Sequence, residues 1–312
     1  MKKISVVIPT FNEEANILPM HEALSQCFKE QLNAYDYEII FIDNKSIDLT
    51  RQKIEELVRR NDQVKAIFNI ANFGQFNSPY YGLLQVQGDC AVLLCADFQD
   101  PIELIPNFVI HWESGARVVC GIKASSKESG LIYALRTFYY KLIKRFSNVD
   151  QIEHFTGFGL YDKSFIEVMR QLHDPSPFLR GIVAEYAPDR VEISYEQKTR
   201  RAGKTKNNWY SLYDAAMLSF TSYTKVGLRL ATFFGFIIAT ISIIIALAYL
   251  ILKLIFWNQF VAGTTPILLS SLVIGGVLLF FVGLLGEYIL NINLRVINRP
   301  LVIEEKRLGF DK

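Results

Sequence analysis

Acidic and amide side chains follow an apolar stretch near the end of the chain's first third. Cys90–Cys95 is apolar, and Asp97, Gln99 and Asp100 come directly after it. Carboxylate and amide oxygens are ligands that hard divalent cations such as Mg²⁺ and Mn²⁺ prefer, whereas a thiol such as that of Cys95 is a poor Mg²⁺ ligand. We therefore expect a divalent-cation site in this loop, with Asp97 as its principal protein ligand.

Basic side chains gather in two places farther along the chain. Arg136 lies in an amphipathic stretch, and a late cluster contains Arg200, Arg201, Lys204 and Lys206. The arginine guanidinium suits planar, bidentate contacts with phosphate oxygens. We expect a phosphate group to be held near a membrane surface by Arg136, Arg200, Arg201 and Lys206. Attraction of the late cluster to anionic lipid headgroups is the alternative.

Apolar runs and helical patterns alternate along the first two-thirds of the chain. Runs typical of buried strands lie at Ile4–Pro9, Tyr37–Asp43, Val64–Asn69, Cys90–Cys95 and Arg117–Ile122. Helical patterns lie between them, at Glu14–Lys29, Leu49–Arg60 and Ser78–Gln87. This alternation predicts an α/β domain with a mainly parallel sheet covered on both faces. Because ligands of such sheets bind beyond the carboxyl ends of the strands, we expect the site in the loops after Pro9, Asp43 and Cys95.

The composition becomes strongly apolar in the last third. Leu230–Leu252 and Ile267–Gly286 contain no charged side chain, and at roughly 20 residues each they suit two membrane-spanning helices. The loop between them, Trp257–Pro266, has no Lys or Arg, but basic residues flank the pair at Lys225, Arg229, Arg295 and Arg299. The positive-inside rule therefore predicts that both termini are cytoplasmic. Two buried core helices are the alternative.

Two amphipathic segments are expected to lie on the membrane surface. In residues 208–226, apolar side chains recur at helical spacing, at Trp209, Leu212, Tyr213, Ala216, Met217 and Phe220. This pattern predicts an interfacial helix before the first span. A second apolar stripe runs from Leu131 to Phe146 beside basic residues. An ordinary core-facing helix is the alternative for that stripe.

Charge and motifs argue against several other classes of protein. The net charge of +2 provides no basic field for nucleic acid. No Gly-x-Gly-x-x-Gly follows the first apolar run and no P-loop is present, which disfavours a dinucleotide oxidoreductase. The four cysteines form no C-x-x-C pair and no zinc-like spacing with histidine. Met1–Ile4 runs into a strand pattern without a signal-peptide layout, so we expect the first domain to stay in the cytoplasm.

Several short motifs, in their order, resemble family 2 glycosyltransferases. Val6–Glu14 is similar to the opening strand and loop of that family, and Ile42–Thr50 to its second-strand signature. Asn72–Gly74 resembles a turn of the polyprenyl-phosphate, or dolichyl-phosphate mannose synthase-like, branch. Asp97–Pro101 resembles the metal-site loop of that branch, and Arg200–Lys206 its late basic loop. With the two C-terminal spans, the resemblance covers nearly the whole chain.

The resemblance implies a GT-A-type, Rossmann-like mixed sheet and a set of roles. A nucleotide-sugar donor is expected to be bound by Pro9, Phe11, Glu13, Asp43, Ala96, Asp97 and Lys123. Within this set, Pro9, Phe11, Glu13 and Asp43 are the expected partners of base and ribose. Asp97, Gln99 and Asp162 are expected to take part in catalysis, and Asp97 to hold Mg²⁺ or Mn²⁺ beside the diphosphate.

The sequence departs from the family pattern at four positions. Cys95 replaces the first acid of an Asp-x-Asp, and Asn44 the second acid of the second-strand pair. Gly157 and Gly159 stand where relatives usually carry Asp and Arg. A phosphate monoester is largely a dianion at neutral pH, because its second pKa is near 6, so it can attack an anomeric carbon without a general base. The loss of a loop carboxylate is therefore compatible with a polyprenyl-phosphate acceptor.

These observations predict four segments. Residues 1–207 form a cytoplasmic GT-A catalytic domain, 208–226 an interfacial helix, 227–291 two transmembrane helices with a short external loop, and 292–312 a cytoplasmic tail.

The expected activity is inverting transfer of a hexose from a nucleotide sugar, with UDP favoured, to polyprenyl phosphate. The product would be a lipid-linked donor for cell-surface glycan modification. A catalytically silent membrane scaffold is the main alternative, and a processive polysaccharide synthase is disfavoured because a Gln-x-x-Arg-Trp motif is missing. Membrane lipids are expected partners, nucleic acid is not, and a homo-oligomer is left open.

Overall fold

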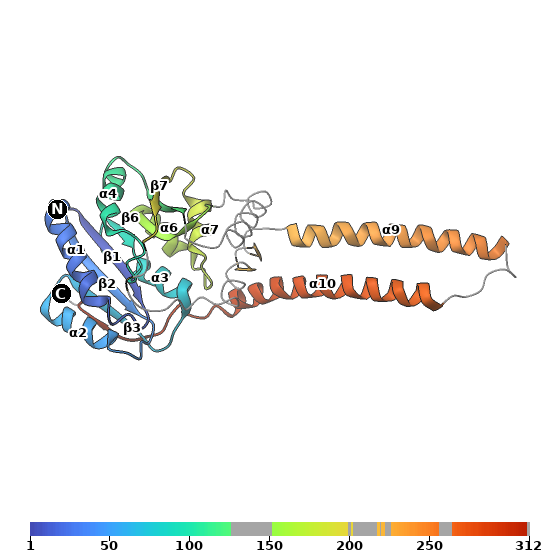
Figure 1. The fold of residues 1–312 in the computed structure, drawn as a ribbon, viewed down its shortest axis with the longest axis horizontal. Coiled ribbons are helices and arrows are strands. Elements are labelled where there is room, and N and C mark those ends of the chain that lie inside the picture. Colours follow the sequence, from blue (N-terminus) through green and yellow to red (C-terminus); the bar gives the residue numbers. More distant parts are fainter. Residues whose placement is uncertain are drawn as a thin grey trace.

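The protein consists of a sheet domain and two long helices that extend from it side by side (Figure 1). This computed structural model describes residues 1–125, 152–198, 201, 217–218, 220–221, 226–255 and 264–310. The second amphipathic stripe, from Leu131 to Phe146, lies outside the described residues, as do most of residues 208–226.

A mixed sheet forms the centre of the domain. Within the described residues its strands are β1 (Lys3–Thr10), β2 (Asp36–Asp43), β3 (Val64–Asn69), β4 (Cys90–Leu93), β5 (Val118–Ser125), β6 (Phe155–Asp162), β7 (Val191–Glu196) and β8 (Glu304–Leu308). The spatial order is β7-β5-β6-β4-β1-β2-β3-β8. β1 pairs in parallel with β2 and β4, β2 with β3, and β5 with β7. β6 lies antiparallel between β4 and β5, and β8 is antiparallel to β3. The predicted α/β class is confirmed.

Helices cover both faces of the sheet. They are α1 (Ile17–Gln31), α2 (Thr50–Arg60), α3 (Gly74–Leu84), η1 (Ile102–Leu104), α4 (Ile105–Glu113), α6 (Lys163–Leu172) and α7 (Leu179–Tyr186). Successive strand residues point to opposite faces, so β1 contributes Val6 to the core under α1, α2 and α4, and Val7 to the core under α3, α6 and α7. Two apolar layers therefore hold the sheet rigid between its helices.

The sequence did not predict β6, β7 or β8. β6 contains Gly157 and Gly159, and a Cβ on Gly159 would lie 2.4 Å from the Val119 carbonyl oxygen of β5, so an arginine could not occupy this position without a backbone shift. β8 has the sequence Glu-Glu-Lys-Arg-Leu and no apolar alternation. The predicted cytoplasmic tail, 292–312, therefore needs correction: residues 304–308 are an edge strand of the sheet.

The two predicted spans lie inside long helices. Leu230–Leu252 lies in α9 (Val226–Ile255), and Ile267–Gly286 lies in α10 (Thr264–Ile297). Among the described residues one stretch, Ile274–Ile297, has the length and mean hydropathy, 1.8, of a membrane span, and only 6% of it is buried. Membrane crossing by α9 stays a prediction.

The end of α10 nearest the sheet domain is attached to it. The Arg295 guanidinium lies 3.3 Å from the Asp174 carboxylate, in the loop between α6 and α7. The Asn291 amide donates to the Thr221 hydroxyl at 2.8 Å, and the rings of Phe220 and Tyr288 lie 6.4 Å apart. The described part of the predicted interfacial helix thus packs on α10. The chain then runs back along the domain to β8 (Figure 1).

Candidate active site at the carboxyl edge of the sheet

The loops in which the sequence predicts the site lie together at one edge of the sheet. Because β6 and β8 are antiparallel to their neighbours, their amino ends lie beside the carboxyl ends of the other strands. The loops after Thr10, Asp43 and Leu93 therefore meet there, together with the start of β6. This edge faces α9 and α10, because β1 runs from the far end of the domain toward them (Figure 1).

Asp43 lies beneath the surface of this edge. Its side chain is fully buried, and its carboxylate accepts hydrogen bonds from the Ser46 amide, at 3.0 Å, and the Ser46 hydroxyl. The Arg51 Nε lies 3.2 Å from Oδ2 of the same carboxylate, the oxygen that also accepts from the Ser46 backbone N–H. Burial raises the pKa of Asp43, and the Ser46 bonds oppose that rise. The structure thus makes Asp43 an organiser of the loop after β2 rather than an exposed contact for a base.

The opening loop, Pro9–Glu13, is fixed to the loop after β2. The Asn12 backbone N–H donates to the Ser46 hydroxyl at 2.8 Å, and Asn12 adopts the left-handed region with a φ of 56°. The Glu13 amide donates to the Thr50 hydroxyl at 2.8 Å. Partly exposed side chains remain at Pro9, Phe11 and Glu13. This loop therefore presents the predicted stacking and polar groups on a rigid support.

Asn44 explains one departure from the family pattern. Its side-chain oxygen accepts from the Asn69 amide at 3.1 Å, the Phe73 backbone N–H at 3.3 Å and the Ser78 hydroxyl. Its side-chain nitrogen donates to the Gly74 carbonyl at 3.3 Å. A carboxylate can only accept, so it could not reproduce the last bond. Asn44 holds the turn between β3 and α3.

The loop after β4 is joined to the segment after β7. The Gln99 N–H donates to the Asp97 carboxylate at 3.1 Å, and Phe98 between them has a φ of 61°. The Arg201 N–H donates to the Asp97 carbonyl at 3.4 Å, and the Arg201 guanidinium lies 5.2 Å from the centre of the Phe98 ring. Arg201 is thus brought to Asp97 and Gln99. Three other predicted residues, Arg136, Arg200 and Lys206, lie outside the described residues.

Charges of both signs are packed around this loop. Asp100 is buried and accepts from the Tyr195 hydroxyl at 2.6 Å; burial raises the pKa of its carboxyl group. Burial lowers the pKa of Lys123 in β5, and the Asp100 charge opposes that shift. Cys95 is an exposed residue, but the protein packed around its thiol, with Asp100 and Asp97, raises the pKa of that group. Arg180 of α7 adds a further positive charge near Lys123. Such mutually perturbed groups cluster at functional sites.

Asp162 lies at the opposite edge, so its predicted catalytic role needs correction. It ends β6 and pairs in register with Cys90, the first residue of β4. Its carboxylate caps α6 by accepting from the Ser164 N–H at 2.7 Å, and it accepts from the Trp112 indole at 2.7 Å. Partial burial would raise the pKa of Asp162, but these bonds outweigh it and lower the pKa. Asp162 is a structural cap.

One further predicted site residue, Ala96, and one departure from the family pattern, Gly157, can be placed. Ala96 is buried beneath the loop after β4, so it offers only its backbone to a ligand. Gly157, near the start of β6, has a φ of 105°, and a Cβ there would touch Leu93 at 3.4 Å. The glycine therefore suits a left-handed backbone that an aspartate would strain.

The residues of this edge fit a divalent cation that takes only part of its coordination sphere from the protein and the rest from a bound ligand. Among the described residues, no three His, Cys, Asp or Glu side chains form a ready cage. Asp97 and Asp100 nevertheless supply hard oxygen atoms near Cys95 and Lys123. Mg²⁺ is commonly held by one or two carboxylates and by substrate phosphates. The donor set thus matches a cation that arrives with, or is completed by, a diphosphate.

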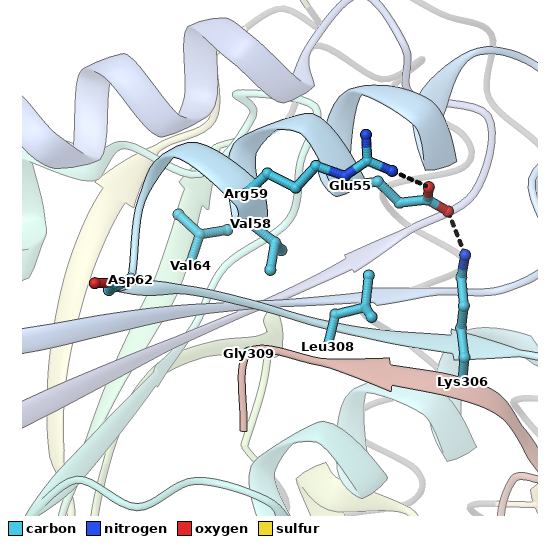
Figure 2. A pocket seen from close by; sticks show the side chains of 8 residues that line it. All are labelled: Glu55, Val58, Arg59, Asp62, Val64, Lys306, Leu308 and Gly309. Atoms are coloured by element: carbon cyan, nitrogen blue, oxygen red, sulfur yellow. Dashed lines mark hydrogen bonds and ion pairs between the residues drawn. The ribbon is translucent and has the colours of Figure 1, made fainter. Parts of the chain in front are cut away.

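Two cavities elsewhere contain none of these residues. One of about 280 Å³ lies between α2 and β8, where Glu55 pairs with Arg59 and Lys306 (Figure 2). Another, of about 320 Å³, is lined by residues 86–88 and by α6. None of the charged side chains that line these cavities is buried, whereas Asp97 and Asp100 at the carboxyl edge are, so the edge remains the candidate site.

Known proteins resemble this chain over nearly its whole length. A solved structure, glucosyl-3-phosphoglycerate synthase from Mycobacterium tuberculosis, has a TM-score of 0.47 at 16% identity, over 70% of this chain and 78% of that one. The family model for glycosyl transferase family 2 matches residues 5–187. The SfII prophage-derived bactoprenol glucosyl transferase of Shigella flexneri is 32% identical over 97% of this chain and 98% of its own length. A prophage bactoprenol glucosyl transferase homolog of Escherichia coli is 31% identical over 96% and 98%.

Proposed function

Since the chain belongs to glycosyl transferase family 2, it is a glycosyltransferase, and we propose that it transfers a hexose from a nucleotide sugar to polyprenyl phosphate. A UDP-sugar is the favoured donor, and the cytoplasmic membrane face is the proposed place of reaction. The product is a lipid-linked hexose that serves cell-surface glycan modification.

One observation carries this proposal: the similarity to bactoprenol glucosyl transferases continues from the sheet domain through both long helices. The match spans 97% of this chain and 98% of the Shigella flexneri relative. Bactoprenol is a polyprenyl lipid, and an enzyme that modifies such a lipid must reach a membrane surface. The membrane-like helix α10 and the sheet edge that faces it support this acceptor class.

The proposed donor site spans the carboxyl edge. Pro9, Phe11 and Glu13 would contact the nucleoside, and Lys123, with Arg180 beside it, would compensate the diphosphate charge. Asp97 and Asp100 would hold Mg²⁺ or Mn²⁺, which supplies charge neutralisation of the leaving group when bound. Gln99 lies in the same turn as Asp97 and is proposed to orient the bound donor.

The proposed reaction is a direct displacement with inversion. A phosphate oxygen of the acceptor forms a bond to the anomeric carbon, and the bond from that carbon to the donor diphosphate breaks. The bonding pair leaves with the nucleoside diphosphate. The acceptor is already ionised at neutral pH, so no protein base is required. Arg201 is proposed to hold the acceptor phosphate, together with Arg136, Arg200 and Lys206.

We further propose that α9 and α10 both span the membrane, with both termini cytoplasmic. Large apolar side chains on both helices are exposed, including Phe236 at 73% and Phe280 at 67%, which a lipid environment would cover. A reporter fused after Lys312 should be cytoplasmic, and a tag within 258–263 should be reachable only from outside. A C-terminal reporter on the external side would contradict this topology.

A donor screen tests the proposed function. Purified full-length protein in detergent is incubated with a short-chain polyprenyl phosphate, Mg²⁺ or Mn²⁺, and a series of UDP- and GDP-hexoses. The proposal expects one donor to yield a polyprenyl-phosphate hexose and an equal amount of nucleoside diphosphate. Hydrolysis without lipid product for every donor would contradict the proposed acceptor.

A further inference from the structure

Strand β8 joins the membrane-like helices to the proposed donor loops. The chain leaves α10 at Ile297 and enters β8 at Glu304, where it pairs with the edge of β3. Four of the five residues of β8 are charged, so apolar burial contributes little to its position. The polar partners of those side chains therefore decide how β8 contacts the domain.

Glu305 makes two ion pairs on the α2 side of β8. Its carboxylate lies 2.8 Å from the Lys45 Nζ and 3.0 Å from the Arg51 Nη2. The hydrogen bond from Lys45, followed by that from Arg51, lowers the pKa of Glu305 to about 2. The carboxylate is therefore ionised throughout the neutral range. Glu305 thus fixes the end of the Arg51 side chain.

Arg51 carries this contact into the domain. Its Nε lies 3.2 Å from the buried Asp43 carboxylate, and its guanidinium lies 4.9 Å from the centre of the Phe68 ring. Asp43 in turn accepts from Ser46, whose hydroxyl accepts from the Asn12 N–H of the opening loop. Polar contacts are therefore continuous from Glu305 to the loop that carries Phe11 and Glu13.

We propose that Glu305 is a positioning residue for the nucleotide donor, acting through Arg51 and Asp43 on the opening loop. The proposal rests on the proposed function, because it takes the opening loop as the nucleoside site. It assigns a role in donor binding to the segment that follows the last membrane-like helix. Glu305 need not touch the nucleotide.

The test compares two isosteric variants of neighbouring residues. Glu305→Gln removes the charge that holds Arg51. Glu304→Gln is the matched control, because Glu304 bonds to the Tyr81 hydroxyl of α3 at 2.8 Å and to Arg307, not to Arg51. UDP and GDP are titrated into each full-length protein in detergent, and the Kd is measured. Donor KM, acceptor KM and kcat are then measured with the active donor.

We expect Glu305→Gln to raise the Kd of the nucleotide about two- to fivefold, as the loss of a partly exposed ion pair does. Donor KM should rise equally, while kcat and acceptor KM stay at the wild-type values. Arg51→Gln should raise the Kd further, and Glu305→Asp should recover part of the loss. Glu304→Gln should bind as the wild type does.

Wild-type nucleotide affinity in Glu305→Gln would overturn the inference. Equal weakening in Glu304→Gln would also overturn it, since the effect would then come from general docking of β8. A wild-type protein that binds UDP but makes no lipid product would contradict the proposed transfer, and the Kd comparison of the two variants would then decide this inference by itself. A wild-type protein that binds neither UDP nor GDP would remove the donor site and the inference together.

Discussion

The two halves of the carboxyl edge are built differently. Around β1, β2 and β3, polar side chains are buried and hydrogen-bonded, Asp43 to Ser46 and Asn44 to Asn69. Around β4, β5 and β7, carboxylates and cations surround Cys95, and burial shifts the pKa of Asp100 upward and that of Lys123 downward. A network of hydrogen bonds holds the loops in one conformation. Buried ionisable groups with shifted pKa values, in contrast, are stabilised when a charged ligand binds beside them. We therefore propose that the first half positions the donor and that the second half performs the chemistry.

The largest expected effect is in the second half. Asp97→Ala should reduce transfer about a hundredfold or more, because charge stabilisation at the leaving group is lost. Transfer is measured against Mg²⁺ and Mn²⁺ concentration, with thermal melting as the check on folding. Asp162→Ala is the control: it should lower the melting temperature by removing the cap of α6 but retain near-wild-type turnover. Undiminished transfer by Asp97→Ala, or full wild-type activity in chelator, would contradict the metal-assisted mechanism.

Arg201 gives the next largest effect. Arg201→Ala should reduce transfer to polyprenyl phosphate about tenfold or more while nucleotide affinity is retained, since a charge-assisted contact to the acceptor is lost. Lysine at this position should recover only part of the lost transfer activity, because it lacks the planar guanidinium that makes bidentate contacts. Lys198→Ala is the matched control, because Lys198 pairs with Glu103 at 2.7 Å. If Arg201→Ala weakened donor and acceptor binding equally, Arg201 would be assigned to the donor diphosphate instead of the acceptor phosphate. Arg200→Ala is predicted to behave as Arg201→Ala does.

Lys123 should give a pH-dependent effect. Its pKa lies below 10.5 because burial disfavours the ammonium, so the charge is lost at a lower pH than for an ordinary lysine. Donor KM should therefore rise with pH before pH 10.5 is reached. Lys123→Arg keeps the charge and should flatten this rise, whereas Lys123→Met should raise donor KM at every pH. An alkaline rise of the same size in Lys123→Arg would assign the titration to another group.

Asn44→Asp tests the positioning half. The Gly74 carbonyl would lose its donor and a charge would be buried, at a cost of about 1–3 kcal/mol. For a domain of this size, the melting temperature should fall by roughly 2–4 °C per kcal/mol. Measured kcat should change little. A large fall in kcat with an unchanged melting temperature would erase the distinction between the two halves.

Cys95→Asp should have the smallest effect on turnover. It places a hard oxygen where the sequence has sulfur, so Mg²⁺-dependent transfer should be retained or improved. Without cation, the added charge beside Asp97 and Asp100 should lower thermal stability, and Mg²⁺ should restore it. Loss of Mg²⁺ use in Cys95→Asp would show that the pocket is shaped around the thiol.

The sequence predicted the parts of the fold that apolar patterns encode. Val64–Asn69 has the bounds of β3, and Leu49–Arg60 starts one residue before α2. β8 carries no apolar signal, because an edge strand made of charged residues is held by ion pairs rather than by burial. The sequence places Asp162 in the site, because sequence order does not reveal that β6 runs antiparallel, which moves its end to the far edge. It also places Asp43 in the loop after β2, but only the packing of Asp43 with Ser46 and Arg51 shows that this side chain is buried.

The formation of lipid product by the wild-type protein tests the central claim most directly. Full-length protein in detergent receives its donor nucleotide sugar, a short-chain polyprenyl phosphate and Mg²⁺ or Mn²⁺, and mass spectrometry follows lipid and nucleotide together. The account predicts equal amounts of polyprenyl-phosphate hexose and nucleoside diphosphate, and no product in chelator. A protein that binds the nucleotide sugar and leaves both substrates unchanged would be a silent scaffold and would contradict the account.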